Sequence, residues 1–333
     1  MNLSYNDIYG LADHYNIPLA VTIELNTTCN LRCKHCYIPE HNNVGLSFDE
    51  ISSMLHQLRA LGTFELVFTG GEIFARRDIM DIIRMAREMH FEVILFTNVT
   101  LLNPKMINEL KELYVTMVST TIFSLDPEIH DGITKVKNSL HTALKNLQLL
   151  KEAGVPVEVK TILLSDNYNS FLELETYCKN EGFRYIATPY VFAKSDQSAE
   201  PTKLRMTSEQ MEEVMEDVDR ISGFEVREKC SEDYVCPSIK HSLGINAEGM
   251  VSPCNAMFMD VGNIRQNSIE SIWNSDKLNA IKNIMFKDLN RCTTCEVSKY
   301  CVRCAGTALL EDGGLLNPST LACQVARARA VHH

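Results

Sequence analysis

Short apolar runs alternate with segments of helical periodicity along the first 190 residues. Six runs have the length and composition of buried strands: 19–25, 65–69, 91–97, 116–122, 157–163 and 183–189. Between them, apolar residues recur every three or four positions, which predicts helices at 47–61, 78–89, 104–113, 140–153 and 170–181. This order is typical of β-α units around a parallel sheet. Six units are fewer than the eight that close a barrel.

Capping residues mark several of these helix ends. Ser47 and Glu50 have the spacing of a capping box, and Gly62 follows the last apolar position of that helix. Asp78 and Ser139 are the predicted caps of two further helices, and Gly154 is the predicted end of the second. The boundaries therefore rest on cap chemistry as well as on periodicity.

The pattern changes after the sixth strand. Residues 193–206 are polar and predict a linker, and a helix at 207–221 follows with apolar residues on one face and acidic residues on its solvated face. From Cys230 onward turns become frequent, and eight of the twelve cysteines appear. The predicted organisation is an N-terminal extension (1–18), a β-α region (19–195), a linker with a bridging helix (196–229) and a cysteine-rich domain (230–333).

Composition narrows the class of protein. Hydrophobic residues make up 45% of the chain and charged residues 23%, as in globular proteins. The net charge of -11 disfavours nucleic acid as a partner, and no apolar run approaches the roughly 20 residues of a membrane span. We therefore expect a cytoplasmic protein. Because thiols stay reduced in that compartment, twelve cysteines indicate metal binding rather than disulfides.

Three of the cysteines follow the first predicted strand directly. Cys29, Cys33 and Cys36 can hold three irons of a four-iron cluster and leave the fourth iron open to an outside ligand. The alternative is structural zinc, which normally takes four protein ligands. His35 lies between two of the cysteines, and no nearby residue completes a zinc site cleanly.

The Cys-x3-Cys-x2-Cys loop in a chain of six β-α units resembles the radical S-adenosylmethionine (SAM) enzymes. The resemblance implies an α/β fold, a partial (β/α)6 TIM-like barrel, in which SAM chelates the open iron. It also implies that an electron from the reduced cluster cleaves SAM to a 5′-deoxyadenosyl radical, which abstracts hydrogen from a substrate.

Secondary motifs extend the resemblance to SAM contacts. It implies that Gly70, Gly71 and Glu72 bind the SAM amino group, although Ile73 stands where the family often has proline. The other implied contacts are the pair Thr97 and Asn98, Thr121 or the competing Ser124 at the ribose, His35 at the adenine and Lys160 at the carboxylate. A lone lysine at a strand end is more often simply solvated.

The C-terminal cysteines are similar to the SPASM extension of radical SAM enzymes, which binds two auxiliary four-iron clusters. The spacing between Cys301 and Cys304 is two residues, where the usual pattern has three. The resemblance assigns Cys230, Cys236, Cys254 and Cys304 to auxiliary cluster I, and Cys292, Cys295, Cys301 and Cys323 to auxiliary cluster II. Alternatively, Cys230 is free, as a hydrogen donor or beside an open iron. Cys178 and Trp273, the only tryptophan, are expected in the core.

SPASM enzymes commonly modify peptides, and the segment 126–139 is similar to stretches in maturases of ribosomally made peptides. We therefore expect cross-linking, such as thioether formation, or epimerisation of a precursor peptide. Asn255 stands where sulfatase-maturing relatives have an aspartate base, which argues against that activity. No catalytic base is assigned.

The expected cofactors are SAM and three four-iron clusters, and the expected partners are a precursor peptide and a reductant such as flavodoxin or ferredoxin. About 18 residues precede the first strand, too few for the leader-binding domain of many relatives, so any leader is expected to bind elsewhere on the enzyme or to a separate leader-binding protein. The alternatives are an enzyme of small-molecule or tetrapyrrole cofactor synthesis and, as a non-enzyme, a zinc-binding module.

Overall fold

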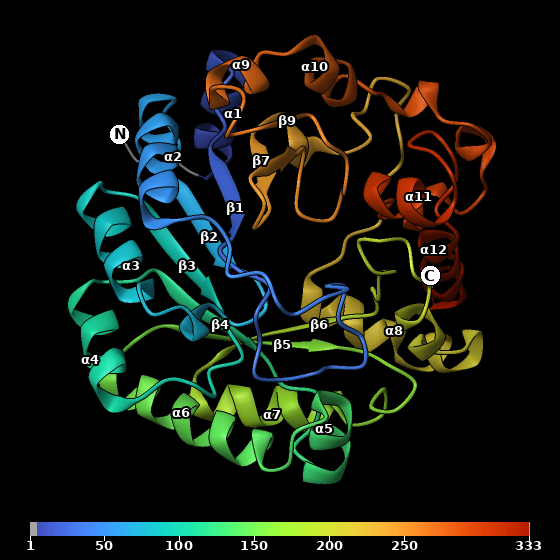
Figure 1. Ribbon diagram of the computed structural model, residues 1–333. Helices are drawn as coiled ribbons and strands as arrows, with labels where there is room; N and C mark the ends of the chain where they lie inside the picture. Colours follow the sequence, from blue (N-terminus) through green and yellow to red (C-terminus); the bar gives the residue numbers. More distant parts are fainter. Residues whose placement is uncertain (1–4, 333) are drawn as a thin grey trace.

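The computed structural model describes residues 5–332 and contains the six predicted parallel strands in sequence order. They are β1 (Ala20–Glu24), β2 (Glu65–Thr69), β3 (Glu92–Phe96), β4 (Met117–Thr121), β5 (Val157–Ile162) and β6 (Arg184–Thr188). The connecting helices are α2 (Phe48–Ala60), α3 (Ile79–Glu88), α4 (Pro104–Glu112), α6 (Ser139–Ala153) and α7 (Phe171–Glu181). They lie along one side of the curved sheet (Figure 1). The predicted partial barrel is confirmed.

Most predicted caps are present. The Ser47 hydroxyl accepts from the Glu50 amide and the Glu50 carboxylate accepts from the Ser47 amide, so the capping box of α2 is complete. The prediction for Ser139 is wrong: Asn138 is the N-cap of α6, and the buried Ser139 hydroxyl instead donates to Asp131. Asp78 precedes α3 but caps no amide with its side chain, because both carboxylate oxygens accept from Arg76.

Two helices that precede β5 were not predicted. Helix α1 (Tyr5–Tyr15) lies in the N-terminal extension, and α5 (Pro127–Thr134) lies between β4 and α6. Asp126 caps α5 by accepting from the Glu128 amide, and Pro127 fits the first turn because no amide is needed there.

The sheet does not end at β1. Strand β7 (Ser242–Ile245) pairs parallel with β1, from Ala20 opposite Ser242 to Ile23 opposite Ile245. Strands β8 (Met250–Ser252) and β9 (Gly262–Asn263) then add antiparallel, giving the order β6-β5-β4-β3-β2-β1-β7-β8-β9. The cysteine-rich part of the chain therefore shares one sheet with the barrel strands.

Of the remaining helices, one lies between β6 and β7 in the sequence and the others follow β9. They are α8 (Ser208–Ser222), α9 (Ile269–Trp273), α10 (Asp276–Lys282), α11 (Ala305–Glu311) and α12 (Thr320–His332). In Figure 1 the C-terminal elements, orange to red, lie across the strands from α3 and α4. Helices α8 and α12 pack against each other and bury an apolar cluster that includes Met215 and Val325.

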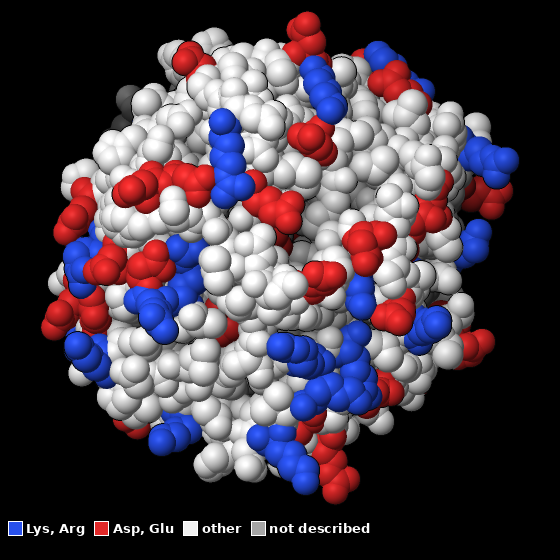
Figure 2. All heavy atoms as spheres, viewed as in Figure 1, with Lys and Arg blue, Asp and Glu red and all other residues white. Residues whose placement is uncertain are grey.

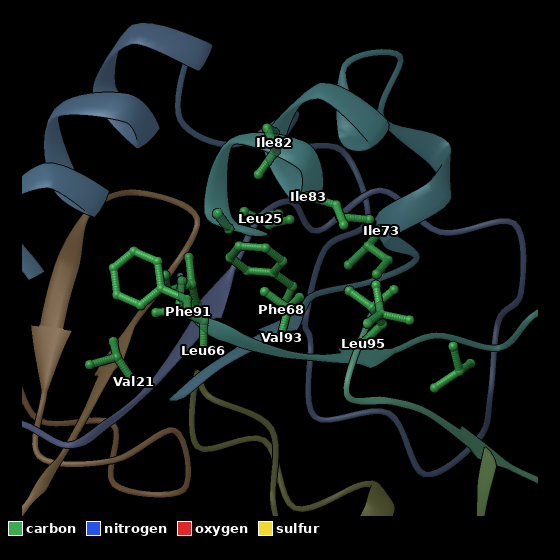
Figure 3. Close-up of a cluster of buried hydrophobic side chains, with 14 of the residues drawn as sticks. Val21, Leu25, Leu66, Phe68, Ile73, Ile82, Ile83, Phe91, Val93 and Leu95 are labelled. Carbon is green, nitrogen blue, oxygen red and sulfur yellow. The ribbon is translucent and has the colours of Figure 1, made fainter. Parts of the chain in front are cut away.

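The main core lies between the sheet and its covering helices. Leu66 and Phe68 of β2 pack beside Val93 and Leu95 of β3, under Ile82 and Ile83 of α3 (Figure 3). Cys178 and Trp273 are both buried, which confirms their predicted places in the core. No helix of the described residues is long and apolar enough to cross a membrane.

Candidate active site

The loop after β1 carries Cys29, Cys33 and Cys36 and is fixed at several points. The amides of Arg32 and Lys34 donate to carbonyls of Thr134 and Ile133, at the end of α5. Burial, together with the neighbouring thiols of Cys36 and Cys29, raises the pKa of the Cys33 thiol to about 12. Burial likewise raises the pKa of Cys36 to about 11. The three thiols are thus neighbours in a shielded site.

A cavity of about 590 Å³ opens beside this loop. All three cysteines line it, together with residues at the carboxyl ends of the barrel strands, the usual place for active sites in such folds. Its opposite wall comes from the cysteine-rich part: Asn255, Ala256, Phe258, Val302, Arg303 and Cys304. One space therefore connects the first cysteine loop with a C-terminal cysteine. On the face drawn in Figure 2, acidic side chains are widely spread, and basic side chains are densest in the lower part, with others along the upper and right edges.

Gly70 and Gly71 bring the end of β2 against the start of the cysteine loop. A Cβ on Gly71 would lie 2.4 Å from the carbonyl oxygens of Thr27 and Thr28. Gly70 has φ +146°, and its Cβ would lie 2.3 Å from the Asn26 carbonyl oxygen. Both glycines also line the cavity, so they bring backbone to its wall.

Glu72 is fully buried and does not line the cavity. Its carboxylate accepts from the Thr97 hydroxyl (2.7 Å), the Asn98 amide (2.7 Å) and the Phe74 amide (2.9 Å). Burial raises the pKa of this carboxyl, although these three donors oppose the rise. The side chain therefore ties β2 to the end of β3 and orients Thr97 and Asn98, which do line the cavity. The contact of Glu72 with the SAM amino group stays a prediction.

The structure separates the two candidates for the ribose contact. Thr121, at the end of β4, lines the cavity. Ser124 is fully buried outside it, and its hydroxyl accepts from the Asp126 amide at 3.0 Å. The geometry therefore favours Thr121.

His35 and Lys160 also line the cavity. Burial lowers the pKa of His35 to about 4, so the imidazole is neutral, and its buried Nδ1 has no hydrogen-bond partner among the described residues. The Lys160 Nζ lies 3.2 Å from Glu158 Oε1 and over the ring of Phe96. Burial lowers the pKa of Lys160, and this lysine is held by protein rather than free in solvent.

Sequence reasoning missed an aromatic pair across the cavity. Tyr37, next to Cys36, and Phe258, four residues after Cys254, stack with ring centroids 5.8 Å apart. The Tyr37 hydroxyl donates to Glu24, at the end of β1, and burial raises the pKa of that carboxyl. Glu24 is an acidic residue at the end of an apolar strand, and this position could have indicated from the sequence that its carboxyl lies near the site.

Three of the four cysteines assigned to auxiliary cluster I lie together. Burial, together with the neighbouring thiols of Cys236 and Cys304, raises the pKa of Cys254 to about 12. Cys230 is exposed, its amide donates to Asp233, and it is not among the groups that perturb these thiols. The structure thus brings Cys236, Cys254 and Cys304 together without Cys230.

The four cysteines assigned to auxiliary cluster II are mutual neighbours. Burial, together with the neighbouring thiols of Cys323, Cys292 and Cys295, raises the pKa of Cys301 to about 11. Cys323 comes from α12, whereas the other three lie in the loops and short helical turns before α11.

Within residues 5–332, no three His, Cys, Asp or Glu side chains are placed to hold one metal ion.

The fold and its cysteine-lined cavity are those of an iron–sulfur enzyme built on a partial barrel. Residues 23–178 match the family model of the radical SAM superfamily, and residues 236–296 match that of the SPASM iron–sulfur cluster-binding domain. The chain belongs to the radical SAM superfamily and carries a SPASM domain, and it is a SAM-dependent enzyme.

Known proteins resemble the chain over most of its length. An AdoMet-dependent heme synthase of Oleidesulfovibrio alaskensis is 23% identical over 325 residues, covering 87% of this chain and 83% of the relative. The subtilosin biosynthesis protein AlbA of Bacillus subtilis is 27% identical, covering 88% and 68%. The crystal structure of Streptococcus suis SuiB bound to the precursor peptide SuiA has a TM-score of 0.73 at 16% identity, covering 97% of this chain and 82% of that one.

Proposed function

We propose that this enzyme is a radical SAM/SPASM peptide maturase, with a catalytic barrel at 19–195 and an auxiliary-cluster domain at 230–333. It takes hydrogen from a residue of a ribosomally made precursor and forms a cross-link, such as a thioether, or an epimer. The observation that carries the proposal is the single cavity that reaches from the first cysteine loop to Cys304. A substrate held there would face both the radical source and an auxiliary cluster.

The proposed cofactors are SAM and three four-iron clusters. Cys29, Cys33 and Cys36 would hold the SAM-binding cluster, and the neighbouring thiols at Cys236, Cys254 and Cys304 and around Cys301 fit two auxiliary clusters. When bound, SAM and its reduced cluster supply the 5′-deoxyadenosyl radical. Cys230 completes auxiliary cluster I only if its exposed segment moves toward Cys236; otherwise one iron stays open.

The side chains around the cavity would bind and orient SAM. His35 lines the cavity, and its neutral imidazole would pack against the adenine of SAM. Thr97, Asn98 and Thr121 offer hydroxyl and amide groups from the ends of β3 and β4. Lys160 offers a cation to the SAM carboxylate. Apolar residues from β5, β6 and the facing loops, such as Ile162, Ile186 and Phe258, would exclude water.

The partners belong to the same proposal. SuiB with its precursor peptide and the bacteriocin protein AlbA support a peptide substrate. A low-potential carrier such as flavodoxin or ferredoxin would supply the electron, and a separate protein would present the leader.

Anaerobic purification and reconstitution test the chemistry. We expect about 12 irons per chain, from three four-iron clusters, and 5′-deoxyadenosine after addition of SAM and dithionite. Replacing Cys29, Cys33 and Cys36 together by alanine should abolish that product and remove one cluster. Cys178→Ala, at a buried cysteine outside the cluster sets, is the matched control. It should still form 5′-deoxyadenosine and should keep the full iron content. Unchanged 5′-deoxyadenosine from the triple variant would show that the loop assignment is wrong.

Mass spectrometry of a precursor peptide encoded beside this gene tests the substrate. A loss of two hydrogens indicates a cross-link, and one deuterium gained in heavy water indicates epimerisation. A peptide that stays unmodified while 5′-deoxyadenosine accumulates would contradict the proposal.

A second candidate function is tetrapyrrole modification, because several of the similar curated proteins are AdoMet-dependent heme synthases. Incubation of the reconstituted enzyme with SAM, reductant and an iron-porphyrin precursor of heme distinguishes the two candidates. Formation of heme would favour this candidate, and an unchanged porphyrin would exclude it.

A further inference from the structure

Arg303 stands between the two sets of auxiliary cysteines. It lies between Cys301, assigned to auxiliary cluster II, and Cys304, assigned to auxiliary cluster I, in the loop before α11. This is the segment in which the cysteine spacing is one residue shorter than usual. Arg303 also lines the cavity beside Cys304. The short spacing therefore places one guanidinium next to ligands of both clusters.

Backbone carbonyls hold this guanidinium in place. Nε donates to the Asn317 carbonyl at 3.2 Å, and Nη2 donates to the carbonyls of Asn317 and Leu315. Both carbonyls belong to the segment that leads from α11 into α12, which carries Cys323. The positive charge is thus fixed relative to the loop before α11 and to the segment between α11 and α12.

The remaining nitrogen, Nη1, is buried and has no hydrogen-bond partner among the described residues. A buried donor without an acceptor is costly, so such a group calls for a partner. The side chains that act on the guanidinium electrostatically are the thiols of Cys292, Cys301 and Cys304 and the carboxylate of Asp312. Asp312 already accepts from the amide and hydroxyl of Thr320. We assign the sulfur of Cys292 as the acceptor of Nη1, because the Arg303 guanidinium opposes the rise in the pKa of that thiol both by its charge and as a hydrogen-bond donor.

We propose that Arg303 is a positioning residue that gives both auxiliary clusters a shared positive charge and, through Nη1, a hydrogen bond to cluster sulfur. The inference rests on the proposed cluster content. Because reduction potentials of iron–sulfur clusters depend on net charge and on hydrogen bonds to the sulfurs, Arg303 raises the potentials of both auxiliary clusters together. A higher potential makes these clusters better electron acceptors on the substrate side of the cavity.

Redox titration of the reconstituted holoenzyme, followed by electron paramagnetic resonance, tests the shared charge. In Arg303→Gln we expect the reduction potentials of both auxiliary clusters to fall by about 59 mV. This shift corresponds to about a tenfold change in each one-electron reduction equilibrium. Arg303→Lys keeps the charge and should stay closer to the wild type, and the SAM-binding cluster serves as an internal reference. Arg265→Gln, at an exposed arginine paired with Glu50, is the control and should change nothing.

Pulsed resonance on wild-type enzyme labelled with 15N-arginine tests the hydrogen bond without any substitution. A 15N coupling to a reduced auxiliary cluster is expected, and its absence would overturn the Nη1 contact. Wild-type potentials in Arg303→Gln with full iron, or a shift of one cluster alone, would overturn the shared charge. If the wild type holds fewer than two auxiliary clusters by iron content, the proposed cluster content fails instead, so the two failures are distinct.

Discussion

A single methyl group at Gly71 would collide with two backbone carbonyls of the loop that leads to Cys29. We expect Gly71→Ala to destabilise the protein by about 1–3 kcal/mol, the usual cost of overpacking, and to weaken SAM binding, because the end of β2 must move. Urea denaturation and equilibrium binding of SAM measure the two effects.

Gly132 is the matched control. It lies in α5, and a Cβ there meets nothing within 4 Å. Gly132→Ala should leave SAM binding unchanged and stabilise the fold by about 0.5–1 kcal/mol, as expected for glycine to alanine within a helix. Equal losses of stability in the two variants would contradict the steric account.

Lys282 should make stability depend on pH. Its side chain is buried over the ring of Trp273, and burial, with the nearby Lys240, lowers its pKa to about 7, whereas Asp13 opposes the shift. The unfolded chain, with a pKa of 10.5, then binds more protons than the folded chain between about pH 7 and 10.5. The contribution of Lys282 to stability is therefore complete above this window and is lost as the pH falls toward 7.

Lys282→Met tests this dependence. The variant should be more stable than the wild type at pH 7, and the difference should shrink steadily toward pH 10 in urea denaturation. Lys277→Met, at an exposed lysine of the same helix, should show no such trend. A difference that stays constant with pH would show that Lys282 does not titrate as described.

At the scale of elements, a buried ion pair joins α8 to α12. Asp219 and Arg329 are both buried, with Nε to Oδ1 at 2.9 Å and Nη2 to Oδ1 at 2.9 Å. Removing one partner leaves a buried charge, so Asp219→Ala should cost about 3–5 kcal/mol. Because α12 carries Cys323, the variant should also hold the proposed auxiliary cluster II less firmly, which iron analysis after mild heating measures.

The neighbouring pair of Arg220 and Glu175 is the control. Its arginine is half exposed, and Glu175→Ala should change the free energy of unfolding by no more than about 1 kcal/mol. Replacing both buried partners, with Asp219→Leu and Arg329→Met, should recover much of the loss. A cost for Asp219→Ala no larger than that for Glu175→Ala would refute the coupling of α8 and α12.

The elements that the sequence predicted correctly are those with local signals. Ser47 with Glu50 and the strand–helix alternation define α2 and β1 to β6 within one or two residues, because caps and periodicity act between near neighbours. Helix α5 was missed, although Asp126-Pro127 is a start signal, because eight residues give too little periodicity.

What the sequence could not give are pairings between distant residues. The strand β7 has only four residues, and its partner β1 lies at the other end of the chain. The family resemblance assigned the cysteines to ligand groups, but the exposed position of Cys230 and the burial of Glu72 depend on neighbours that no spacing specifies. The polar contacts around the cavity come from tertiary packing.

At the scale of the whole molecule, the shared sheet predicts one unfolding transition. Parallel pairing of β1 with β7 and the bond from Trp273 Nε1 to the Asn16 carbonyl tie the C-terminal part to the barrel. In urea under anaerobic, reducing conditions, fluorescence of the single tryptophan and far-ultraviolet circular dichroism should give the same midpoint. Two separate midpoints would show that the barrel and the SPASM part unfold independently.

The position of β1 inside the sheet has a consequence for synthesis in the cell. One edge of β1 must wait for β7, which leaves the ribosome about 220 residues later, on the order of 10–40 s at ordinary translation rates. During that interval the nascent chain carries an unpaired strand edge beside three reduced thiols. The yield of intact enzyme therefore depends on how the emerging chain is protected from aggregation and oxidation, and slower growth with added chaperone should raise it.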